Sequence, residues 1–186
     1  MRRILCMLAL MLGAITASAD QTALLEALRG GGHVLLIRHA ATEPGLGDPP
    51  EFRIGDCVTQ RNLSEAGRAQ SRALGEWLRA ERIPLGEVRS SQWCRCVDTA
   101  ELAFGGEFAI QPWPALNSFF GDRGREPMQR EAALADLQRK LAGNRVWVTH
   151  QVNITSLTGV FPAMGEVVVA RPVPGGLEFV GRLRPG

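Results

Sequence analysis

The sequence has few of the side chains that signal a metal centre or a surface for nucleic acid. It contains only three histidines and four cysteines among 186 residues, and they do not have the spacing of a zinc site. Lys140 is the only lysine, and the formal net charge of the whole chain is +2. So small a charge creates no global basic field that would attract nucleic acid or a membrane surface. We therefore expect no metal, no cofactor and no nucleic-acid partner.

The apolar run from Ile4 to Ile15 is too short to span a membrane. It follows Arg2-Arg3 and precedes the small residues Ala17-Ser18-Ala19, which together form the three-part pattern of a cleaved export signal. We therefore predict a signal peptide over residues 1–19 and a single domain over residues 20–186. Loss of the two arginines takes the formal charge from +2 to 0. The mature protein is expected to be periplasmic or secreted and free of the membrane, with its oligomeric state left open.

Three cysteines remain after the predicted cleavage, namely Cys57, Cys94 and Cys96. An exported protein permits disulfides, and an odd number of cysteines leaves one thiol unpaired. Cys94 and Cys96 are too close along the chain to pair comfortably with each other. We therefore expect a bridge from Cys57 to either Cys94 or Cys96, and the sequence does not decide between them.

Buried-strand patterns alternate with helical patterns along the predicted domain. Strands are expected over residues 33–37, 88–91, 108–110, 145–149, 167–170 and 177–183. Helices are expected over residues 20–29, 64–82, 93–104, 126–142 and 153–160. This alternation predicts an α/β fold, a three-layer α/β/α sandwich with a mostly parallel central sheet. The Gly/Pro-rich segment 44–62 is long for a connection in a compact domain, which favours a functional loop over a site.

Three candidate residues follow predicted strands at equivalent positions. His39 follows the first strand and is preceded by Arg38, Arg95 opens a helix after the strand at 88–91, and His150 follows the strand at 145–149. Ligands of open α/β sheets bind at the carboxyl ends of the strands, where these segments meet. An imidazole can attack phosphorus, and a guanidinium can hold two phosphate oxygens. The pattern therefore favours a phosphate site without a metal.

Four segments resemble the histidine phosphatase superfamily, the phosphoglycerate-mutase-like enzymes. Leu36-Ile37-Arg38-His39-Ala40 is similar to the family's first strand and its Arg-His-Gly signature. The other three segments span residues 62–70, 90–100 and 148–151, and they occur in the family's order over nearly the whole predicted domain. The resemblance implies a phosphoglycerate-mutase-like fold. Two residues depart from the family pattern, because Ala40 and Gln151 each stand where the family has glycine.

The resemblance implies an exported phosphomonoesterase of the histidine acid phosphatase type, acting on a small phosphorylated substrate. His39 would form a phosphohistidine, while Arg38, Arg95 and His150 would hold the phosphoryl oxygens. Thr42 and Gln151 are further candidates for contacts with the substrate. Two alternatives stay open: a phosphomutase, and a non-catalytic protein that binds phosphorylated components of the cell envelope.

The general acid is the least certain role in the expected reaction. By the resemblance it should lie in the loop after Arg95, where Asp122 is the first candidate, and an ion pair with a neighbouring arginine is the alternative reading of that residue. Glu43 is the second candidate for the acid and Glu107 the third. The adjacent Phe119 and Phe120 are expected either to wall the site or to belong to the core. Arg53 and Arg61 in the long loop could contact an anionic substrate or face solvent.

Overall fold

The computed structural model describes residues 21–183 of the chain. The predicted signal peptide lies outside the described residues, so its cleavage stays a prediction. Within residues 21–183, no helix combines the length and the apolar character that crossing a bilayer requires.

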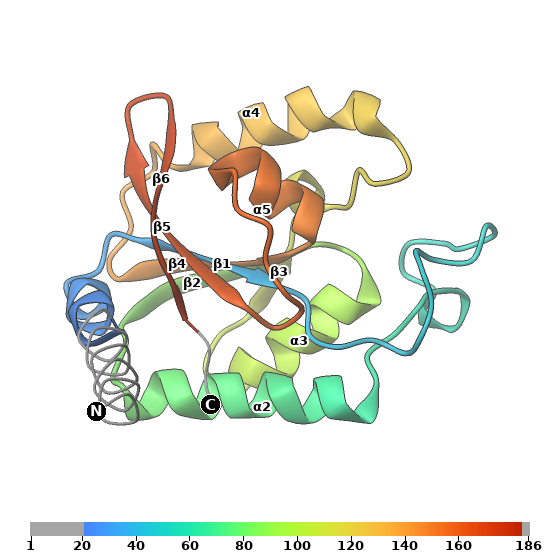
Figure 1. Ribbon diagram of the computed structural model, residues 1–186, viewed down its shortest axis with the longest axis horizontal. Helices are drawn as coiled ribbons and strands as arrows, with labels where there is room; N and C mark the ends of the chain where they lie inside the picture. Colours follow the sequence, from blue (N-terminus) through green and yellow to red (C-terminus); the bar gives the residue numbers. More distant parts are fainter. Residues whose placement is uncertain (1–20, 184–186) are drawn as a thin grey trace, which may run out of the picture.

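The described strands form one six-stranded sheet (Figure 1). They are β1 (Val34–Arg38), β2 (Leu85–Ser90), β3 (Ile110–Pro112), β4 (Asn144–Thr149), β5 (Val167–Val173) and β6 (Gly176–Leu183). Their order across the sheet is β3-β2-β4-β1-β5-β6. The pairs β3–β2, β2–β4 and β4–β1 are parallel, while β5 runs antiparallel to β1 and forms a hairpin with β6. The mostly parallel sheet predicted from the alternating pattern is confirmed.

The helices agree in number and order with the sequence pattern and differ at their ends. Residues 21–29 of the described chain are helical, followed by α2 (Glu65–Ala80), α3 (Cys94–Phe104), α4 (Glu126–Asp136) and α5 (Gln151–Thr158). Short 3₁₀ turns occur at η1 (Cys57–Thr59), η2 (Pro114–Leu116) and η3 (Arg123–Arg125). The helix predicted to reach residue 142 ends at Asp136, because the next three backbone amides bond to carbonyls only three residues back.

Helices cover both faces of the sheet, which makes three layers. Along β1 successive side chains point to opposite faces, as in any strand. Leu35 and Ile37 pack in the core shared with α2, α3 and the helix at residues 21–29. Val34 and Leu36 pack in the second core, against α5 and the helix α4. Figure 1 shows α4 and α5 above the sheet and α2 and α3 below it.

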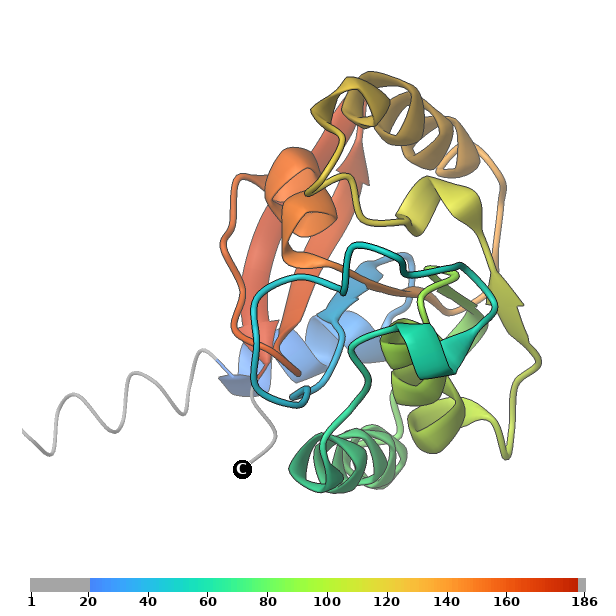
Figure 2. The ribbon, with the colours of Figure 1, turned by 90° about the vertical axis from the view of Figure 1, so that its right-hand side faces the viewer.

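The register of the parallel strands fixes which residues meet at their carboxyl ends. Arg38 of β1 pairs with Thr149 of β4, and Ser90 of β2 pairs with Val148 of β4. The residues that follow these strands therefore arrive at one edge of the sheet. Figure 2 looks onto this end of the molecule, where the long segment between β1 and α2 crosses in front of the strand ends.

The packing of α2 against α3 requires a glycine at position 75. A Cβ atom built on Gly75 would lie 2.1 Å from the carbonyl oxygen of Ala103, so the two helices would have to move apart. We expect Gly75→Ala to lower the free energy of unfolding by about 2 kcal/mol, the usual cost of overpacking a core. Urea denaturation of the purified protein measures it. Gly106→Ala is the matched control, because its Cβ would meet nothing within 4 Å; equal stability of the two variants would contradict the close-packing account.

Candidate active site

His39 lies directly after β1, and one of its ring nitrogens has no hydrogen-bond partner among residues 21–183. Its backbone N–H donates to the Thr149 carbonyl at 2.9 Å, which continues the strand pairing and holds the residue at the sheet edge. Its Nδ1 is 2.9 Å from the Ala40 carbonyl oxygen. A carbonyl can only accept, so Nδ1 carries the proton and the lone pair is on Nε2. The ring is therefore held in the tautomer that presents Nε2 as a nucleophile.

Burial keeps the His39 ring neutral. The residue is 3% exposed, and burial, followed by the positive charge of Arg95, lowers the pKa of His39 to about 3. The hydrogen bond to the Ala40 carbonyl raises the pKa and offsets only part of this effect. A neutral imidazole keeps its nucleophilic lone pair at neutral pH.

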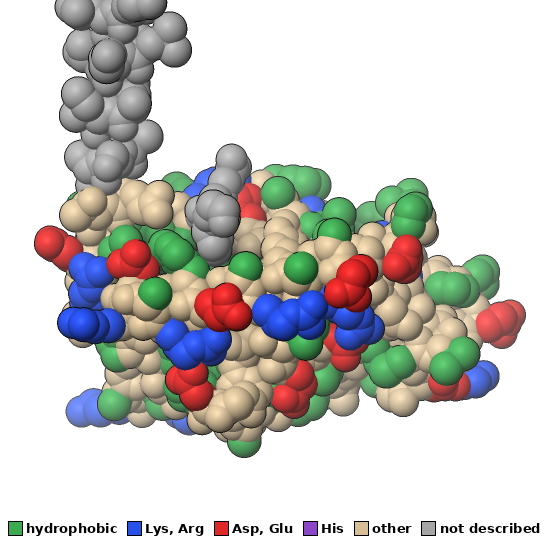
Figure 3. Space-filling model, turned by 90° about the horizontal axis from the view of Figure 1, so that it is seen from below, with side chains coloured by type: hydrophobic (Ala, Val, Ile, Leu, Met, Phe, Trp, Pro, Cys, Tyr) green, Lys and Arg blue, Asp and Glu red, His purple; other side chains and the backbone are tan. Residues whose placement is uncertain are grey.

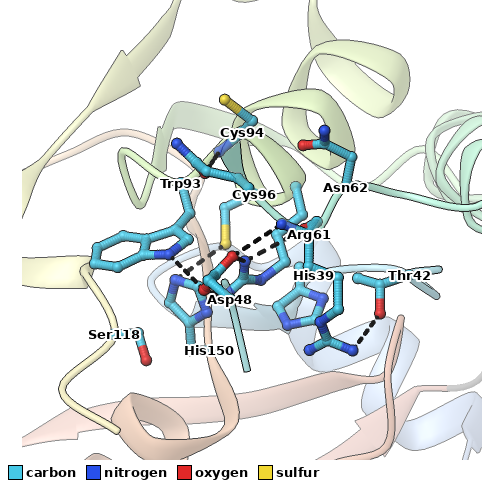
Figure 4. Close-up of polar contacts among 12 residues, drawn as sticks. His39, Thr42, Asp48, Arg61, Asn62, Trp93, Cys94, Cys96, Ser118 and His150 are labelled. Atoms are coloured by element: carbon cyan, nitrogen blue, oxygen red, sulfur yellow. Dashed lines mark hydrogen bonds and ion pairs between the residues drawn. The ribbon is translucent and has the colours of Figure 1, made fainter. Parts of the chain in front are cut away.

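His150 lies beside His39, at the start of α5. The two ring centroids are 5.4 Å apart in an edge-on arrangement, and the indole of Trp93 is 5.3 Å from the His150 ring on another side. His150 Nε2 lies 2.9 Å from the hydroxyl oxygen of Ser91, which follows β2. Burial, followed by the charge of Arg95, holds the pKa of His150 well below its usual value. Figure 4 shows the two imidazoles side by side at the strand ends.

Three arginines surround the two imidazoles and come from three separate segments. Arg38 ends β1 and donates through Nη1 to the Pro162 carbonyl at 2.9 Å. Arg95 lies in the first turn of α3 and is 4% exposed, while Arg61 comes from the long loop. In each of the three side chains the buried Nε has no hydrogen-bond partner among the described residues. Three guanidinium groups around two imidazoles supply the positive charge that an anion with several oxygens binds.

Asp48 is the carboxylate that contacts this arginine group. Its Oδ1 accepts from Arg95 Nη1 at 2.7 Å and its Oδ2 from Arg95 Nη2 at 3.1 Å. The Trp93 indole and the backbone N–H of Arg61 donate to the same carboxylate at 3.0 and 3.1 Å. Burial alone would raise the pKa of Asp48, but the hydrogen bonds and charge of Arg95 outweigh it, so the pKa is lowered and the group is ionised. Figure 4 shows this carboxylate pointing into the arginine group.

A disulfide fixes the long loop to the start of α3. It joins Cys57 to Cys94, the residue before Arg95, so the structure has one of the two pairings that the sequence left open. Cys96 is the free, buried cysteine, and burial raises the pKa of its thiol to about 12. A thiol that stays protonated is a poor nucleophile, which leaves His39 as the better one in this group.

The predicted substrate contacts Thr42 and Gln151 are partly separated from the site. The Thr42 hydroxyl accepts from Arg61 Nη1 at 2.8 Å, so it touches the arginine group. Gln151 instead donates its amide to Thr155, one turn along α5, at 2.8 Å. Ala40 is the other departure from the family pattern, and its φ is negative. Among residues 21–183, Arg82 is the one non-glycine residue with a positive φ. Alanine therefore fits there without strain.

Among the described residues, no hydrogen bond or ion pair joins a candidate acid to either imidazole. Asp122 is exposed, and its Oδ1 accepts from the Gly124 N–H at 3.2 Å, which caps η3. Glu43 is exposed in the loop after β1. Glu107 lies beyond the far end of α3 and pairs with Arg79 at 3.2 Å. The role of Asp122 as general acid stays a prediction that no contact in the structure supports.

Sequence reasoning missed Asp48 and Ser91 as parts of the site, and it considered Arg61 only as a loop residue that could contact the substrate. Asp48 approaches Arg95 across 47 residues of sequence, so no local spacing signals the contact. The Ser-Ser pair at the end of β2 was visible only as part of the family pattern. Among residues 21–183 no group of His, Cys, Asp and Glu side chains could hold a metal ion.

The sequence model of the histidine phosphatase superfamily (branch 1) matches residues 34–142, more than half of the chain. The chain belongs to the histidine phosphatase superfamily. The match begins at β1, just before Arg38 and His39, and it includes the whole of α3 with Arg95. A search of curated proteins finds no match.

Solved structures share the fold of this superfamily member at low sequence identity. The protein histidine phosphatase SixA complexed with tungstate has a TM-score of 0.56 at 19% identity, covering 82% of this chain and 97% of that one. A putative α-ribazole-5′-P phosphatase from Escherichia coli gives 0.57 at 17% identity, covering 80% and 94%. A phosphoserine phosphatase mutant from Entamoeba histolytica in complex with phosphoserine gives 0.57 at 15% identity, covering 81% and 95%. The phosphoglycerate-mutase-like fold predicted from the sequence is confirmed.

The charges of the site suit a phosphate monoester. Three guanidinium groups and one ionised carboxylate around two neutral imidazoles leave two positive charges in excess. A phosphate monoester at neutral pH carries nearly two negative charges. The excess positive charge of this group therefore matches the charge of a phosphoryl group next to Nε2 of His39.

The neutral state of His39 makes stability depend on pH. Because its pKa falls from 6.5 to about 3 on folding, the unfolded chain takes up the proton first, and the free energy of unfolding decreases as the pH drops below 6.5. Wild-type protein should therefore lose roughly 3 kcal/mol more than His39→Gln between about pH 7 and about pH 4. Urea denaturation at several pH values measures this difference. Parallel pH profiles for the two proteins would show that His39 is not held neutral.

Asp48 should affect both stability and anion binding. Asp48→Asn leaves the buried Arg95 without its counter-charge, and we expect the free energy of unfolding to fall by about 3 kcal/mol. Inorganic phosphate should then raise the melting temperature of this variant more than that of wild type, because the anion replaces the lost negative charge. Asp98→Asn is the control, since Asp98 pairs with Arg68 in a half-exposed bridge of 3.4 Å. Equal stabilisation by phosphate in all three proteins would refute this electrostatic account.

Proposed function

We propose that the protein hydrolyses a phosphate monoester through a phosphohistidine on His39. The observation that carries the proposal is the His39 ring itself, which is neutral, buried and held by the Ala40 carbonyl with its Nε2 lone pair free. Phosphoryl transfer needs a positioned nucleophile and positive charge around the equatorial oxygens. The arginine group supplies that charge without a metal.

In the first step, Nε2 of His39 forms a bond to phosphorus while the bond from phosphorus to the leaving oxygen breaks. The electron pair of the broken bond stays on the leaving oxygen. Positive charge develops on the imidazole ring, and the Ala40 carbonyl, which accepts from Nδ1, stabilises it. Arg38, Arg95 and His150 would hold the three remaining oxygens. In the second step, water attacks phosphorus and releases a proton to solvent, the electron pair of the bond between phosphorus and Nε2 returns to Nε2, and inorganic phosphate leaves.

No carboxylic acid among the described residues is in place to protonate the leaving oxygen. Among the described residues, the carboxylate in contact with the arginine group is Asp48, which is ionised and engaged with Arg95. An ionised carboxylate cannot donate a proton. We therefore infer that substrates with acidic leaving groups, such as aryl phosphates, react most readily. The same observation favours the second candidate function, a non-catalytic binder of phosphorylated ligands.

We further propose that the protein acts outside the cytoplasm. The three-part pattern at residues 1–19 supports this, and so does the Cys57–Cys94 disulfide, because such bridges persist in oxidising compartments. A single phosphate-binding site and the absence of a large charge excess favour a small phosphorylated substrate.

Turnover of 4-nitrophenyl phosphate in the presence of EDTA tests the proposed function, because its phenolate leaves without protonation. We expect hydrolysis by wild type, and a loss on the order of 10³-fold or more in kcat/KM for His39→Ala. His33→Ala is the matched control, because His33 lies just before the opposite end of β1 and its ring contacts the Gly31 carbonyl. Full activity of His39→Ala would disprove the nucleophile. Phosphate binding without any turnover by wild type would favour the binder.

A further inference from the structure

Large exposed hydrophobic side chains concentrate around the candidate active site. Those on the three loops near the carboxyl ends of the strands are called the apolar rim, which consists of Leu46, Ile54, Val58, Phe120, Phe161 and Met164. Leu46 and Val58 are the most exposed members, at 90% and 95%. Isolated exposed hydrophobic residues are ordinary in soluble proteins, whereas a group of them around one polar site indicates a binding surface.

Two members of the apolar rim adjoin residues that hold the arginines. Leu46 follows a glycine whose carbonyl accepts from Arg61 Nη1 at 2.8 Å. Phe161 precedes Pro162, whose carbonyl accepts from Arg38 Nη1 at 2.9 Å. These two apolar side chains therefore come from two different segments next to the arginines, the long loop and the segment between α5 and β5.

Two further members are fixed in place by contacts of their own segments. Val58 follows Cys57, whose disulfide to Cys94 ties the long loop to the start of α3. The sulfur of Met164 accepts from the Thr42 hydroxyl at 3.9 Å, which joins the segment before β5 to the loop after β1. These contacts tie the two segments to neighbouring parts of the site.

Phe120 adds an aromatic side chain from a third segment. Its neighbour Phe119 is 2% exposed and belongs to the core, whereas Phe120 itself is 57% exposed. Figure 4 places Ser118, two residues earlier, on the side of Trp93 and His150. The sequence left open whether Phe119 and Phe120 belong to the core or wall the site. In the structure Phe119 lies in the core and Phe120 lies at the rim.

The charges of the long loop bear on what the apolar rim contacts. Glu43, Glu51 and Asp56 all lie on this loop, and of its two arginines Arg53 pairs with Asp56 at 2.6 Å while Arg61 faces the site. Carboxylates on the loop would oppose an anionic bilayer, whose surface attracts basic segments. Figure 3 shows hydrophobic side chains intermixed with acidic ones at the right-hand end, over the protruding loop. The hydrocarbon part of a single ligand avoids this repulsion.

We propose that the apolar rim binds the hydrocarbon part of the substrate, so that the enzyme selects phosphate monoesters of amphiphilic molecules over those of sugars or nucleosides. This inference rests on the proposed function. The arginine group takes the phosphate, and an aliphatic or alkyl-aryl group extends from it across the rim. Because the rim is open to solvent on one side, each added methylene is only partly buried, which corresponds to about a twofold gain in kcat/KM per methylene.

A series of 4-alkylphenyl phosphates, from methyl to hexyl, tests this selection below their micellar concentrations. The acidity of the leaving phenol stays nearly constant along the series, so a change in kcat/KM reports contact with the chain. We expect an increase of at least about tenfold from methyl to hexyl in wild type. The double variant Leu46→Ser with Val58→Ser should lose this dependence. Phe179→Ser on β6, which replaces an exposed phenylalanine away from the site, should keep it.

The outcomes separate this proposal from the proposed function. Turnover that does not depend on chain length, or a dependence that survives in the double variant, overturns the rim while the phosphatase stands. If no compound of the series turns over, 4-nitrophenyl phosphate decides the proposed function separately, and calorimetric titration of the same series tests the rim through the dissociation constants. If the protein cosediments with phosphatidylcholine vesicles and its kcat/KM does not depend on the alkyl chain length, the rim is a membrane surface and the proposal is overturned. Circular dichroism checks that each variant is folded.

Discussion

The ion pair between Asp48 and Arg95 is the interaction on which the rest of the site depends. Three guanidinium groups gathered around two buried imidazoles repel one another, and burial of their charge costs free energy. Asp48 offsets part of that cost through four hydrogen bonds to three donor residues. Its two contacts with Arg95 use both Nη atoms and leave the buried Nε of that guanidinium free. One carboxylate thus holds the arginine without cancelling the charge of the group.

The same charge helps to keep the nucleophile neutral. Burial is the main cause that lowers the pKa of His39, and the positive charge of Arg95, with smaller effects of Arg38 and Arg61, lowers it further. The long loop takes part in this arrangement because it supplies Asp48 and Arg61, and its disulfide to Cys94 holds it against α3. The loop is therefore a wall of the site, and its outward side chains form the apolar rim. Anion binding, nucleophile activation and contact with a hydrocarbon group would all depend on one tied loop.

Local periodicity and parallel strand pairing were enough to predict the elements of the fold and the positions of the two histidines. The strand ends placed His39 and His150 together because both follow buried strands whose parallel register is fixed by their hydrophobic faces. The contact between Asp48 and Arg95 could not be predicted from strand positions, since Asp48 lies in an irregular loop. Only long-range packing brings that loop to α3. The role of Asp122 as general acid stays a prediction, and its carboxylate has a local partner in the structure. Its carboxylate caps η3, and such capping competes with any longer reach.

The account predicts one covalent intermediate, a phosphoryl group on Nε2 of His39. Rapid quenching of the wild-type reaction with 4-nitrophenyl phosphate at neutral to alkaline pH, followed by peptide mass spectrometry, tests it most directly. The expected result is a phosphoryl group on the peptide that contains His39, formed and lost at rates that match turnover. Turnover without any phosphorylated peptide, or with the label on His150 or Cys96, would contradict the central claim.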